Sequence, residues 1–359
     1  MLFNLAPRAM ASASPMLDRC TFGSLTRIAD LDTRAFRVAP RSRSRWARGD
    51  YVVGRVTDTS GYRTIELPSG RDMEVAEGDA VVGALGTRQA TLEMTGSWRE
   101  IEDNGVMHAL TRAGLFGRVE SRSTLVQRPL ELRYDGHVQR DGTAVTMQGV
   151  VEPVDEQPFA TPTVLFAGTS MSAGKTTAAR IVTRRLKRMG LSVVGAKVSG
   201  AGRYRDVLSI QDAGADWGLD FVDVGLPSTV VPKEDYRAAI RQLLSRMAQP
   251  AADVAVVEIG ASPLEPYNGA LAIKELQNAL AMTVLCASDP YAVLGLETAF
   301  EMLAPDLVTG IATNTAAGTA LLEQLTDLPA FNIRDNDTHE RLDALLRDRL
   351  QIVEEMPAD

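Results

Sequence analysis

The stretch at 163–189 constrains the fold of this chain more than any other. Its sequence is TVLFAGTSMSAGKTTAARIVTRRLKRM, in which apolar, β-prone residues at 164–167 lead into a glycine loop at 168–176. The loop opens directly into a pattern with helical periodicity. Strand, glycine loop and helix in this order are the context that a phosphate-binding loop (P-loop) requires. The stretch therefore predicts an α/β domain with an anion site at a helix N-terminus.

The loop predicts a role for each of its residues. The backbone N–H groups of 172–176 would surround a β-phosphate, because unpaired donors and the helix dipole both favour an anion there. Lys175 would reach the β- and γ-phosphate oxygens, and the Thr176 hydroxyl would bind Mg²⁺. The candidate nucleotide-binding residues of the loop are Gly168, Thr169, Ser172, Ala173, Gly174, Lys175, Thr176 and Thr177.

Composition and charge narrow the classes of protein that the chain can belong to. Its 359 residues are enough for two domains, and 45% of them are hydrophobic and 23% charged, as in ordinary globular proteins. A net charge of -8 argues against a general nucleic-acid binder, because no positive field is available to release counterions. No apolar run approaches the length of a membrane span, and the two cysteines lack metal-ligand spacing. We expect a cytoplasmic protein that binds neither nucleic acid nor membrane.

The part before the glycine loop is interpreted as a β-rich domain over 26–155, preceded by a loose N-terminus over 1–25. Short β-prone runs separated by turn residues predict a small antiparallel barrel or sandwich. A window at 106–113 is instead typical of a helix. Proline-rich, acidic sequence at 152–158 marks the boundary to the second domain. The predicted strands are 51–57, 62–67, 79–85, 90–94, 131–138 and 143–148.

From 160 to 359 the pattern alternates between apolar β-prone runs and helical segments. This alternation predicts a mostly parallel sheet with helices on both faces. Ligands of such sheets lie at the carboxyl ends of the strands, so the residues that follow each strand are candidates for chemistry. The predicted strands after the loop are 191–197, 254–259, 282–287, 307–313 and 330–333, with a shorter apolar run at 221–224 and predicted helices at 236–248 and 337–350.

Charged and polar side chains follow several of these strands. Lys197 ends a buried run and precedes two glycines, where it could neutralise a transferring phosphoryl group. The carboxylate of Glu258 ends another buried run, and its burial is costly unless it faces a cation such as Mg²⁺ at Thr176. By analogy with guanine-specific GTPases, which carry Asn-Lys-x-Asp at this location, Asn314 would read a purine edge; the lysine and the acid are absent here, which favours adenine over guanine.

The glycine loop has the form Gly-Thr-x4-Gly-Lys-Thr, with Thr169 where the usual spacing has its first glycine. This form resembles the P-loop of dethiobiotin synthetase and of related ATP-dependent amide and carbamate synthetases. Ser170 stands where the cell-division and arsenite ATPases carry an extra lysine. The resemblance covers about 163–336 and does not extend to the β-rich domain.

The resemblance to dethiobiotin synthetases implies roles for residues at the strand ends. Lys197, Ser199 and Gly200 match a Lys-Pro-…-Ser-Gly segment shortened by two residues, whose lysine is catalytic. Allowing for that shortening, Asp212 matches an aspartate that binds Mg²⁺. Glu258 matches the glutamate of a Glu-Gly-Ala-Gly segment with one residue inserted. The competitors of Asp212 for the metal are Asp206 and Asp216.

The same motifs also resemble a second P-loop family, which includes D-amino-acid N-acetyltransferases. Its loop is likewise Gly-Thr-x4-Gly-Lys, and the aspartates within 206–228 are similar to its aspartate-rich middle. This second resemblance implies that the loop could hold the phosphates of coenzyme A and need no nucleotide hydrolysis.

Together these features predict an Mg²⁺-ATP-dependent ligase or phosphotransferase of the dethiobiotin-synthetase-like class. It would activate a small carboxylate or carbamate by phosphoryl transfer and join it to an amine. ATP and Mg²⁺ are the expected cofactors, a small molecule is the expected substrate, and a homodimer is one option for the assembly. Two alternatives stay open, a coenzyme-A-dependent N-acyltransferase and a nucleotide-switched chaperone or regulatory NTPase. The predicted catalytic residues are Lys175 and Lys197, and the predicted metal ligands are Thr176, Asp212 and Glu258.

Overall fold

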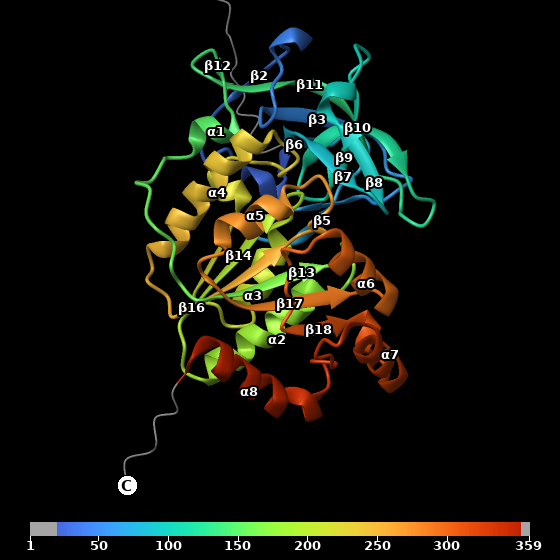
Figure 1. Cartoon of the computed structure of the whole chain (residues 1–359). Helices are drawn as coiled ribbons and strands as arrows, with labels where there is room; N and C mark the ends of the chain where they lie inside the picture. Colours follow the sequence, from blue (N-terminus) through green and yellow to red (C-terminus); the bar gives the residue numbers. More distant parts are fainter. Residues whose placement is uncertain (1–19, 353–359) are drawn as a thin grey trace, which may run out of the picture.

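The computed structural model describes residues 20–352 as two parts that lie side by side (Figure 1). The first part is a β-rich barrel, and the second is an α/β domain that begins at β13 (Thr163–Gly168). The predicted loose N-terminus falls largely outside the described residues, and from its last part Cys20–Phe22 forms a strand, β1. None of the helices within 20–352 is long and apolar enough to cross a membrane.

Five strands of the first part close into a ring. β3 (Tyr51–Asp58) pairs with β6 (Ala80–Leu85), which pairs with β10 (Leu115–Arg122), and β9 (Val106–Thr111) and β11 (Glu131–Arg140) complete the circuit. The β6–β10 pairing is parallel and the other four are antiparallel. The predicted β-rich domain is therefore a mainly antiparallel barrel. The shorter elements of this part are β2 (Arg37–Ala39), β4 (Thr64–Glu66), β5 (Asp72–Glu74), β7 (Thr87–Ala90), β8 (Met94–Ser97), β12 (Thr143–Ala144), η2 (Ser24–Ile28), η3 (Arg43–Arg45), η4 (Trp98–Glu100) and α1 (Met147–Val150).

Apolar residues at alternating positions fill the barrel, as the two-residue period of a strand requires. Val52 and Val56 of β3 and Met107 and Ala109 of β9 are buried in one cluster. The helix predicted at 106–113 is wrong, because the segment forms β9 and the turn that follows it. Strand pairing on both sides of β9 outweighs its local helical propensity.

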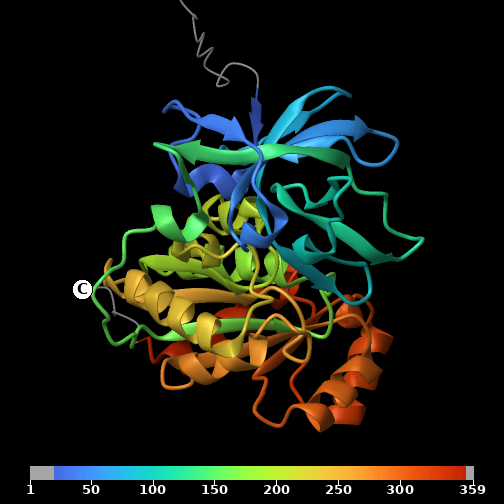
Figure 2. The same cartoon turned by 90° about the horizontal axis from the view of Figure 1, so that it is seen from above.

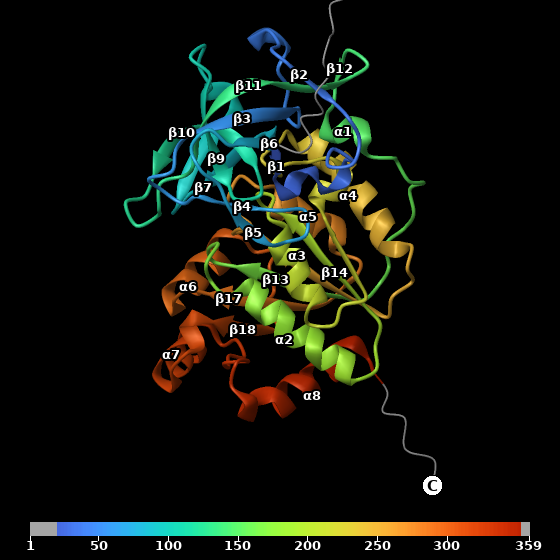
Figure 3. The same cartoon turned by 180° about the vertical axis from the view of Figure 1, so that it is seen from behind.

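The second part is built on a six-stranded sheet in the order β15-β14-β16-β13-β17-β18. All of its neighbouring strands run parallel, which confirms the predicted sheet. Hydrophobic contacts place α2, α3 and α8 on one face and α4, α5, α6 and α7 on the other, and Figure 3 shows α2 and α3 in front of the sheet. The strands after β13 are β14 (Val193–Ser199), β15 (Trp217–Asp220), β16 (Val254–Ile259), β17 (Leu280–Ala287) and β18 (Leu307–Gly310). The helices are α2 (Lys175–Arg188), α3 (Tyr204–Gln211), α4 (Lys233–Ala248), α5 (Gly269–Leu276), α6 (Pro290–Ala299), α7 (Ala316–Thr326) and α8 (His339–Leu350), with short turns η5 (Phe221–Val224), η6 (Ile311–Thr313) and η7 (Asn336–Thr338).

The apolar run at 221–224 is a short turn, η5, that follows strand β15. Asp220 accepts a hydrogen bond from the N–H of Val222 at 2.7 Å, and Asp223 accepts one from the N–H of Asp220 at 2.7 Å. This reciprocal capping box turns the chain at the point where β15 ends.

The last predicted strands are shorter than the sequence pattern indicated. The strand predicted at 307–313 ends at Gly310 and passes into η6. The segment 330–333 adds one bridge, from Ala330 to Val308, and forms no strand of its own.

Residues 151–162 connect the two parts and run along the outside of the molecule from α1 to β13 (Figure 1). The N–H of Val154 donates to Gln242 at 2.9 Å and the N–H of Gln157 donates to Ser245 at 3.0 Å, so the connection lies on α4. Figure 2 shows the barrel and the α/β domain side by side again. The largest hydrophobic cluster contains residues of both parts, so the limits 26–155 and 160–359 stay a prediction.

Candidate functional site

The glycine loop connects β13 to α2 and forms one wall of the candidate site. Gly174 has a φ of 105°, a left-handed conformation that glycine adopts without strain, and Lys175 is the first residue of α2. The end of β18 supports the loop, because a Cβ at Gly310 would lie 2.4 Å from the carbonyl oxygen of Ala173. The start of a helix leaves its first N–H groups without acceptors in the helix, so the loop offers donors to an anion.

Side chains of the glycine loop make contacts at its start and at its middle. The Thr169 hydroxyl accepts a hydrogen bond from the N–H of Ser288 at 3.0 Å, which ties Gly168 and the start of the loop to the end of β17. Ser172 is exposed and lies 3.4 Å from a carboxylate oxygen of Glu93 in the barrel. Thr177 is exposed on the first turn of α2. The loop is thus anchored at its start and faces the barrel at its middle.

Lys175 lies inside the loop and is 2% exposed. Its ammonium donates to the carbonyl oxygen of Ser170 at 2.6 Å and, more weakly, to that of Met171 at 3.4 Å. Burial lowers the pKa of Lys175, and the nearby Glu258 carboxylate opposes this shift. The cation is held by neutral oxygens of its own loop, which phosphate oxygens could replace.

Glu258 is a buried carboxylate with an unused oxygen. It is 3% exposed and lies on β16, between Phe166 of β13 and Lys197 of β14. Thr176 forms a hydrogen bond with it, yet its Oε2 atom is buried without a partner among the described residues. Burial and the nearby Asp206 raise the pKa of Glu258. A buried carboxylate oxygen without a partner is uncommon and indicates a missing cation or donor.

Lys197 and Asp206 form an ion pair beside Glu258. The ammonium of Lys197 lies 2.5 Å from Asp206 Oδ2, and Lys197 is 5% exposed. Burial opposes the charge of Lys197, but the carboxylates of Asp206 and Glu258 outweigh it and raise the pKa of Lys197. The lysine therefore stays charged at neutral pH, next to the carboxylate of Glu258, whose Oε2 atom lacks a partner among the described residues.

These side chains line a cavity of about 420 Å³ between the barrel and the α/β domain. Thr176, Lys197, Asp206 and Glu258 form its wall on the side of the sheet. A volume of this size is enough for a small molecule. The barrel contributes the opposite wall through Tyr62, Arg88, Glu93, Thr111 and Arg112.

The structure does not bring every predicted residue into this cavity. Asp212 follows the last residue of α3 and is exposed, and Asp216 forms an ion pair with Lys187 at 2.7 Å. Asp206, one of the competitors, lies in the first turn of α3 and faces the cavity. Asn314 comes directly after η6, and Gly310, which contacts the loop, comes directly before it. The side chain of Asn314 is exposed and lines no described cavity.

The residues of the cavity fit Mg²⁺. Thr176, Glu258 and Asp206 supply hydroxyl and carboxylate oxygens, the donors that this hard cation prefers. Mg²⁺ in nucleotide sites commonly takes one or two carboxylates, with phosphate and water oxygens completing its shell. Oε2 of Glu258 is the free protein oxygen for this purpose. Within 20–352 no group of three or more His, Cys, Asp or Glu side chains could hold a metal without such additional ligands.

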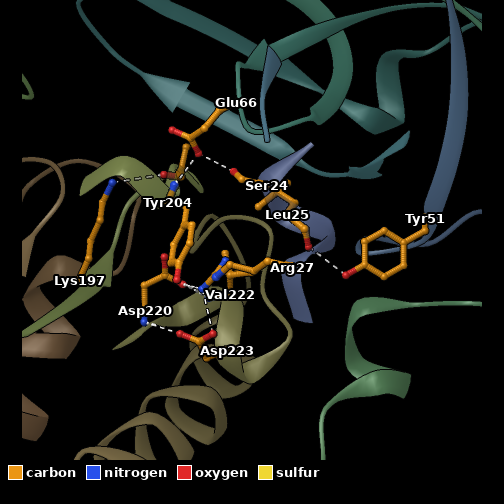
Figure 4. Close-up of polar contacts among 11 residues, drawn as sticks. Ser24, Leu25, Arg27, Tyr51, Glu66, Lys197, Tyr204, Asp220, Val222 and Asp223 are labelled. Atoms are coloured by element: carbon orange, nitrogen blue, oxygen red, sulfur yellow. Dashed lines mark hydrogen bonds and ion pairs between the residues drawn. The ribbon is translucent and has the colours of Figure 1, made fainter. Parts of the chain in front are cut away.

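Barrel residues of the site carry no signal in the sequence. Glu66 of β4 is 1% exposed, and its carboxylate accepts from the N–H of Tyr204 at 2.7 Å, the N–H of Arg205 at 3.2 Å and the hydroxyl of Ser24 at 2.5 Å (Figure 4). It thereby caps the helix that carries Asp206. Tyr204 and Arg205 are 138 and 139 residues from Glu66 in the chain, so only the fold reveals this contact.

Comparison with known proteins gives no family assignment. Neither a protein-family model nor a curated protein matches the sequence. Among solved structures, chloroplast FtsY from Physcomitrella patens is 16% identical, with a TM-score of 0.37 over 53% of this chain and 67% of that one. A DUF1611 family protein from Anabaena variabilis is 18% identical, with a TM-score of 0.35 over 53% of this chain and 58% of that one. The hydrogenase maturation factor HypB from Archaeoglobus fulgidus is 13% identical, with a TM-score of 0.35 over 54% of this chain and 91% of that one.

These likenesses are too distant to carry an argument about function. The fold is instead defined by three features of this structure: a parallel sheet, a glycine loop after β13, and a helix that begins at Lys175. The described residues therefore combine a parallel α/β fold, in which a glycine loop leads from a strand into a helix, with a β-barrel that completes the cavity at this loop.

Proposed function

We propose that this protein is an Mg²⁺-dependent enzyme that uses ATP to activate a small carboxylate or carbamate and joins it to an amine. The observation that carries the proposal is the buried Oε2 of Glu258, which has no partner and lies in a cavity with Thr176, Lys197 and Asp206. A phosphate loop beside two carboxylates and a charged lysine supports phosphoryl transfer. ATP, rather than another nucleotide, and a cytoplasmic homodimer are parts of the proposal that rest on the sequence.

The chain's own groups would act mainly by positioning and by charge. N–H groups of the loop and Lys175 would hold the nucleotide phosphates, while Thr176, Glu258 and Asp206 would hold the metal. Bound Mg²⁺ would neutralise charge on the phosphate oxygens as the γ-phosphoryl group leaves ADP. Lys197 would hold the attacking carboxylate oxygen of the acceptor in line with the γ-phosphorus. An amine nitrogen would then displace phosphate from the activated acid.

Titration with a fluorescent ATP analogue, mant-ATP, with and without Mg²⁺ tests the metal assignment without knowledge of the acceptor. Replacing Glu258→Gln or Asp206→Asn should weaken the Mg²⁺-dependent part of binding roughly tenfold to a hundredfold, since a hydrogen bond to a charged group contributes about 1.5–3 kcal/mol. Metal-free binding should change little, because it comes from the loop N–H groups and Lys175. Lys175→Ala should weaken binding under both conditions.

Asp212→Asn is the matched control, because Asp212 is exposed at the far end of the same helix as Asp206. Its Mg²⁺ response should equal that of the parent. The proposal fails if Glu258→Gln folds normally and keeps the full Mg²⁺ response. Tight binding of acetyl-coenzyme A without Mg²⁺, together with weak binding of mant-ATP, would support the N-acyltransferase instead.

A second function, a nucleotide-dependent chaperone or regulator, is favoured by one observation. Leu92 is 74% exposed and Leu125 is 95% exposed, and both border a second cavity of about 450 Å³ that the phosphate loop also lines. Exposed apolar residues beside a nucleotide site suit a protein partner. This function predicts slow ATP hydrolysis that small acids and amines do not accelerate, whereas the proposed ligase predicts acceleration by its acid substrate.

A further inference from the structure

The cations that line the first cavity differ in how well they are paired. Arg88 forms an ion pair with Glu93 at 2.5 Å, and Lys197 forms one with Asp206 at 2.5 Å. The side chain of Arg203, by contrast, has no hydrogen bond or ion pair among residues 20–352; it is exposed and lines the cavity. Because Arg203 is exposed to solvent, its guanidinium needs no protein partner and is free to bind an anion that enters the cavity. The wall near Arg203 is therefore suited to a negatively charged ligand.

Arg112 of the barrel is the other loosely held cation of this wall. Its guanidinium lies 3.5 Å from Asp72, at the edge of ion-pair distance, and 5.4 Å from the centre of the Tyr62 ring. About a third of the side chain is exposed. Stacking on Tyr62 leaves the edge of the guanidinium plane open to a planar anion.

A chain of contacts places Arg112 close to the start of α3, where Arg203 lies. The carbonyl oxygen of Arg112 accepts a hydrogen bond from the N–H of Glu66 at 2.8 Å. The carboxylate of Glu66 in turn holds the N–H of Tyr204, the residue next to Arg203. Asp72 lies 3.5 Å from Arg112 and 3.9 Å from Arg205. Arg112 and Arg203 thus line the same cavity as Thr176, and the contacts through Glu66 and Asp72 link the segments that carry them.

We propose that Arg112 and Arg203 form a subsite for a carboxylate of the small-molecule substrate, which is held there while its other end reaches Lys197. This inference rests on the proposed function, because the reacting carboxylate or carbamate lies at the phosphate loop. It defines the substrate class as an acid with a second, non-reacting carboxylate. Arginine suits this task because its planar fork can donate two parallel hydrogen bonds to a carboxylate. The subsite also gives the barrel a role in choosing the substrate.

Calorimetric titration of the whole chain with linear dicarboxylates from succinate to pimelate tests the subsite. The titrations are run both with and without Mg²⁺ plus a non-hydrolysable ATP analogue. Two compounds of the same length as glutarate serve as control ligands: glutaramide, which is neutral, and 1,5-diaminopentane, which is cationic. At least one dicarboxylate should bind, and the diamide and diamine should not. Arg112→Gln and Arg203→Gln should each weaken that binding about tenfold to a hundredfold. Arg203→Lys, which keeps the charge but loses the fork, should lie between the parent and Arg203→Gln.

Arg133→Gln is the matched control, because Arg133 is an exposed barrel arginine on β11 that does not line the cavity. It should bind the acid like the parent. The subsite is overturned if no dicarboxylate binds, if the diamide or diamine binds equally well, or if both arginine variants keep the parental affinity. In each case unchanged Mg²⁺-dependent binding of mant-ATP would leave the proposed function standing. Loss of mant-ATP binding in Arg203→Gln would show that Arg203 contacts the nucleotide, and would also overturn the subsite.

Discussion

At the scale of single residues, Arg27, Asp220 and Asp223 form a cluster of charged side chains between the barrel and the α/β domain, in which Asp223 is partly exposed (Figure 4). Arg27 of η2 donates to Asp220 at 2.7 Å and to Asp223 at 2.9 Å, and its guanidinium lies 4.4 Å from the centre of the Tyr204 ring. Asp220 is fully buried, and one of its oxygens has no partner among the described residues. One cation therefore forms ion pairs with two carboxylates.

This arrangement predicts a dependence of stability on pH. Burial and the charge of Asp220 raise the pKa of Asp223 to about 6, and Arg27 opposes them. In the unfolded chain an aspartate titrates near its ordinary pKa of about 3.9. Between these two values the folded protein binds more protons than the unfolded chain, so this group's contribution to stability falls as the pH rises from about 4 through 6.

Asp223→Asn removes that titration and should remove its share of the pH dependence. Urea denaturation at pH 4.5 and pH 7 measures the free energy of unfolding of both proteins. The parent should lose on the order of 2 kcal/mol more than the variant between the two values, since each unit of pKa shift corresponds to about 1.4 kcal/mol. Equal losses in the parent and the variant would show that Asp223 is charged in the folded protein over the whole range.

Sequence reasoning anticipated that Thr176, Lys197 and Glu258 would lie close together, because parallel strands deliver their following residues to one edge of the sheet. Lys197 and Glu258 lie near the ends of neighbouring strands, β14 and β16, and Thr176 lies in the first turn of α2, the helix that follows the next strand, β13. Their meeting therefore follows from the topology. The choice among aspartates could not be made in this way. Asp206 and Asp212 lie at opposite ends of α3, and no local pattern tells which end faces the loop.

At the scale of elements, the most consequential contact is between the β4–β5 hairpin and helix α3. This helix has eight residues and no side-chain cap of its own. Glu66 supplies the cap from the other part of the molecule, by accepting from the N–H groups of Tyr204 and Arg205. A negative charge at a helix N-terminus also interacts favourably with the helix dipole. The barrel therefore fixes the helix on which Asp206 faces Lys197.

Glu66→Ala should lower stability and loosen the site together. Two N–H groups of α3 and the hydroxyl of Ser24 would lose their acceptor, which should cost about 2 kcal/mol or more. The Mg²⁺-dependent part of mant-ATP binding should weaken as Asp206 loses its fixed position, and Glu66→Gln, which keeps an acceptor oxygen, should recover part of both losses. Chemical denaturation and the mant-ATP titration measure the two effects.

Glu74→Ala is the control for the hairpin, because Glu74 is exposed on β5. It should change neither stability nor binding. If Glu66→Ala lowers stability but leaves the Mg²⁺ response intact, the cap is structural and does not position Asp206.

The sequence predicted the elements of the α/β domain better than those of the barrel. Long periodic helices such as α4 and α8 carry their own signal, as do buried strands such as β16. In the barrel, strand β9 is specified by its two neighbours and β1 by pairing with β6, so neither follows from its own residues. Non-local pairing is the physical reason that this part was harder to predict.

At the scale of the whole molecule, the barrel and the α/β domain share apolar as well as polar contacts. Leu25 of η2 is 1% exposed and belongs to the same hydrophobic cluster as Val222 and Leu226, which lie in and after η5. The Tyr267 hydroxyl accepts from the N–H of Gln89 at 2.9 Å across the same boundary. Separation of the two parts would expose this apolar surface and leave Asp220 and Asp223 without their cation. We therefore expect the two parts to unfold as one unit.

Tryptophan fluorescence and circular dichroism, measured on one variant, can follow the unfolding of the barrel and of the α/β domain separately. Trp46 and Trp98 lie in the barrel, while Trp217 is 40% exposed on β15, so Trp217→Phe leaves fluorescence that reports on the barrel with little cost in packing. Among the described residues, all helices of eight residues or more lie in the α/β domain, so circular dichroism at about 222 nm reports mainly on that part. In urea the two signals should change at the same midpoint, as a two-state unit requires.

Loss of the ion pairs between Arg27 and the two aspartates should shift the fluorescence midpoint and the circular dichroism midpoint together. In the Trp217→Phe background, Arg27→Gln would leave the fully buried Asp220 beside a neutral amide and should destabilise by about 3 kcal/mol or more, since loss of one partner of a buried ion pair leaves an uncompensated charge. Arg34→Gln is the control, because the Arg34 side chain is 69% exposed and exposed ion pairs contribute about 1 kcal/mol at most. If Arg27→Gln shifts the fluorescence midpoint and leaves the circular dichroism midpoint in place, the barrel and the α/β domain are energetically independent and the interface only aligns them.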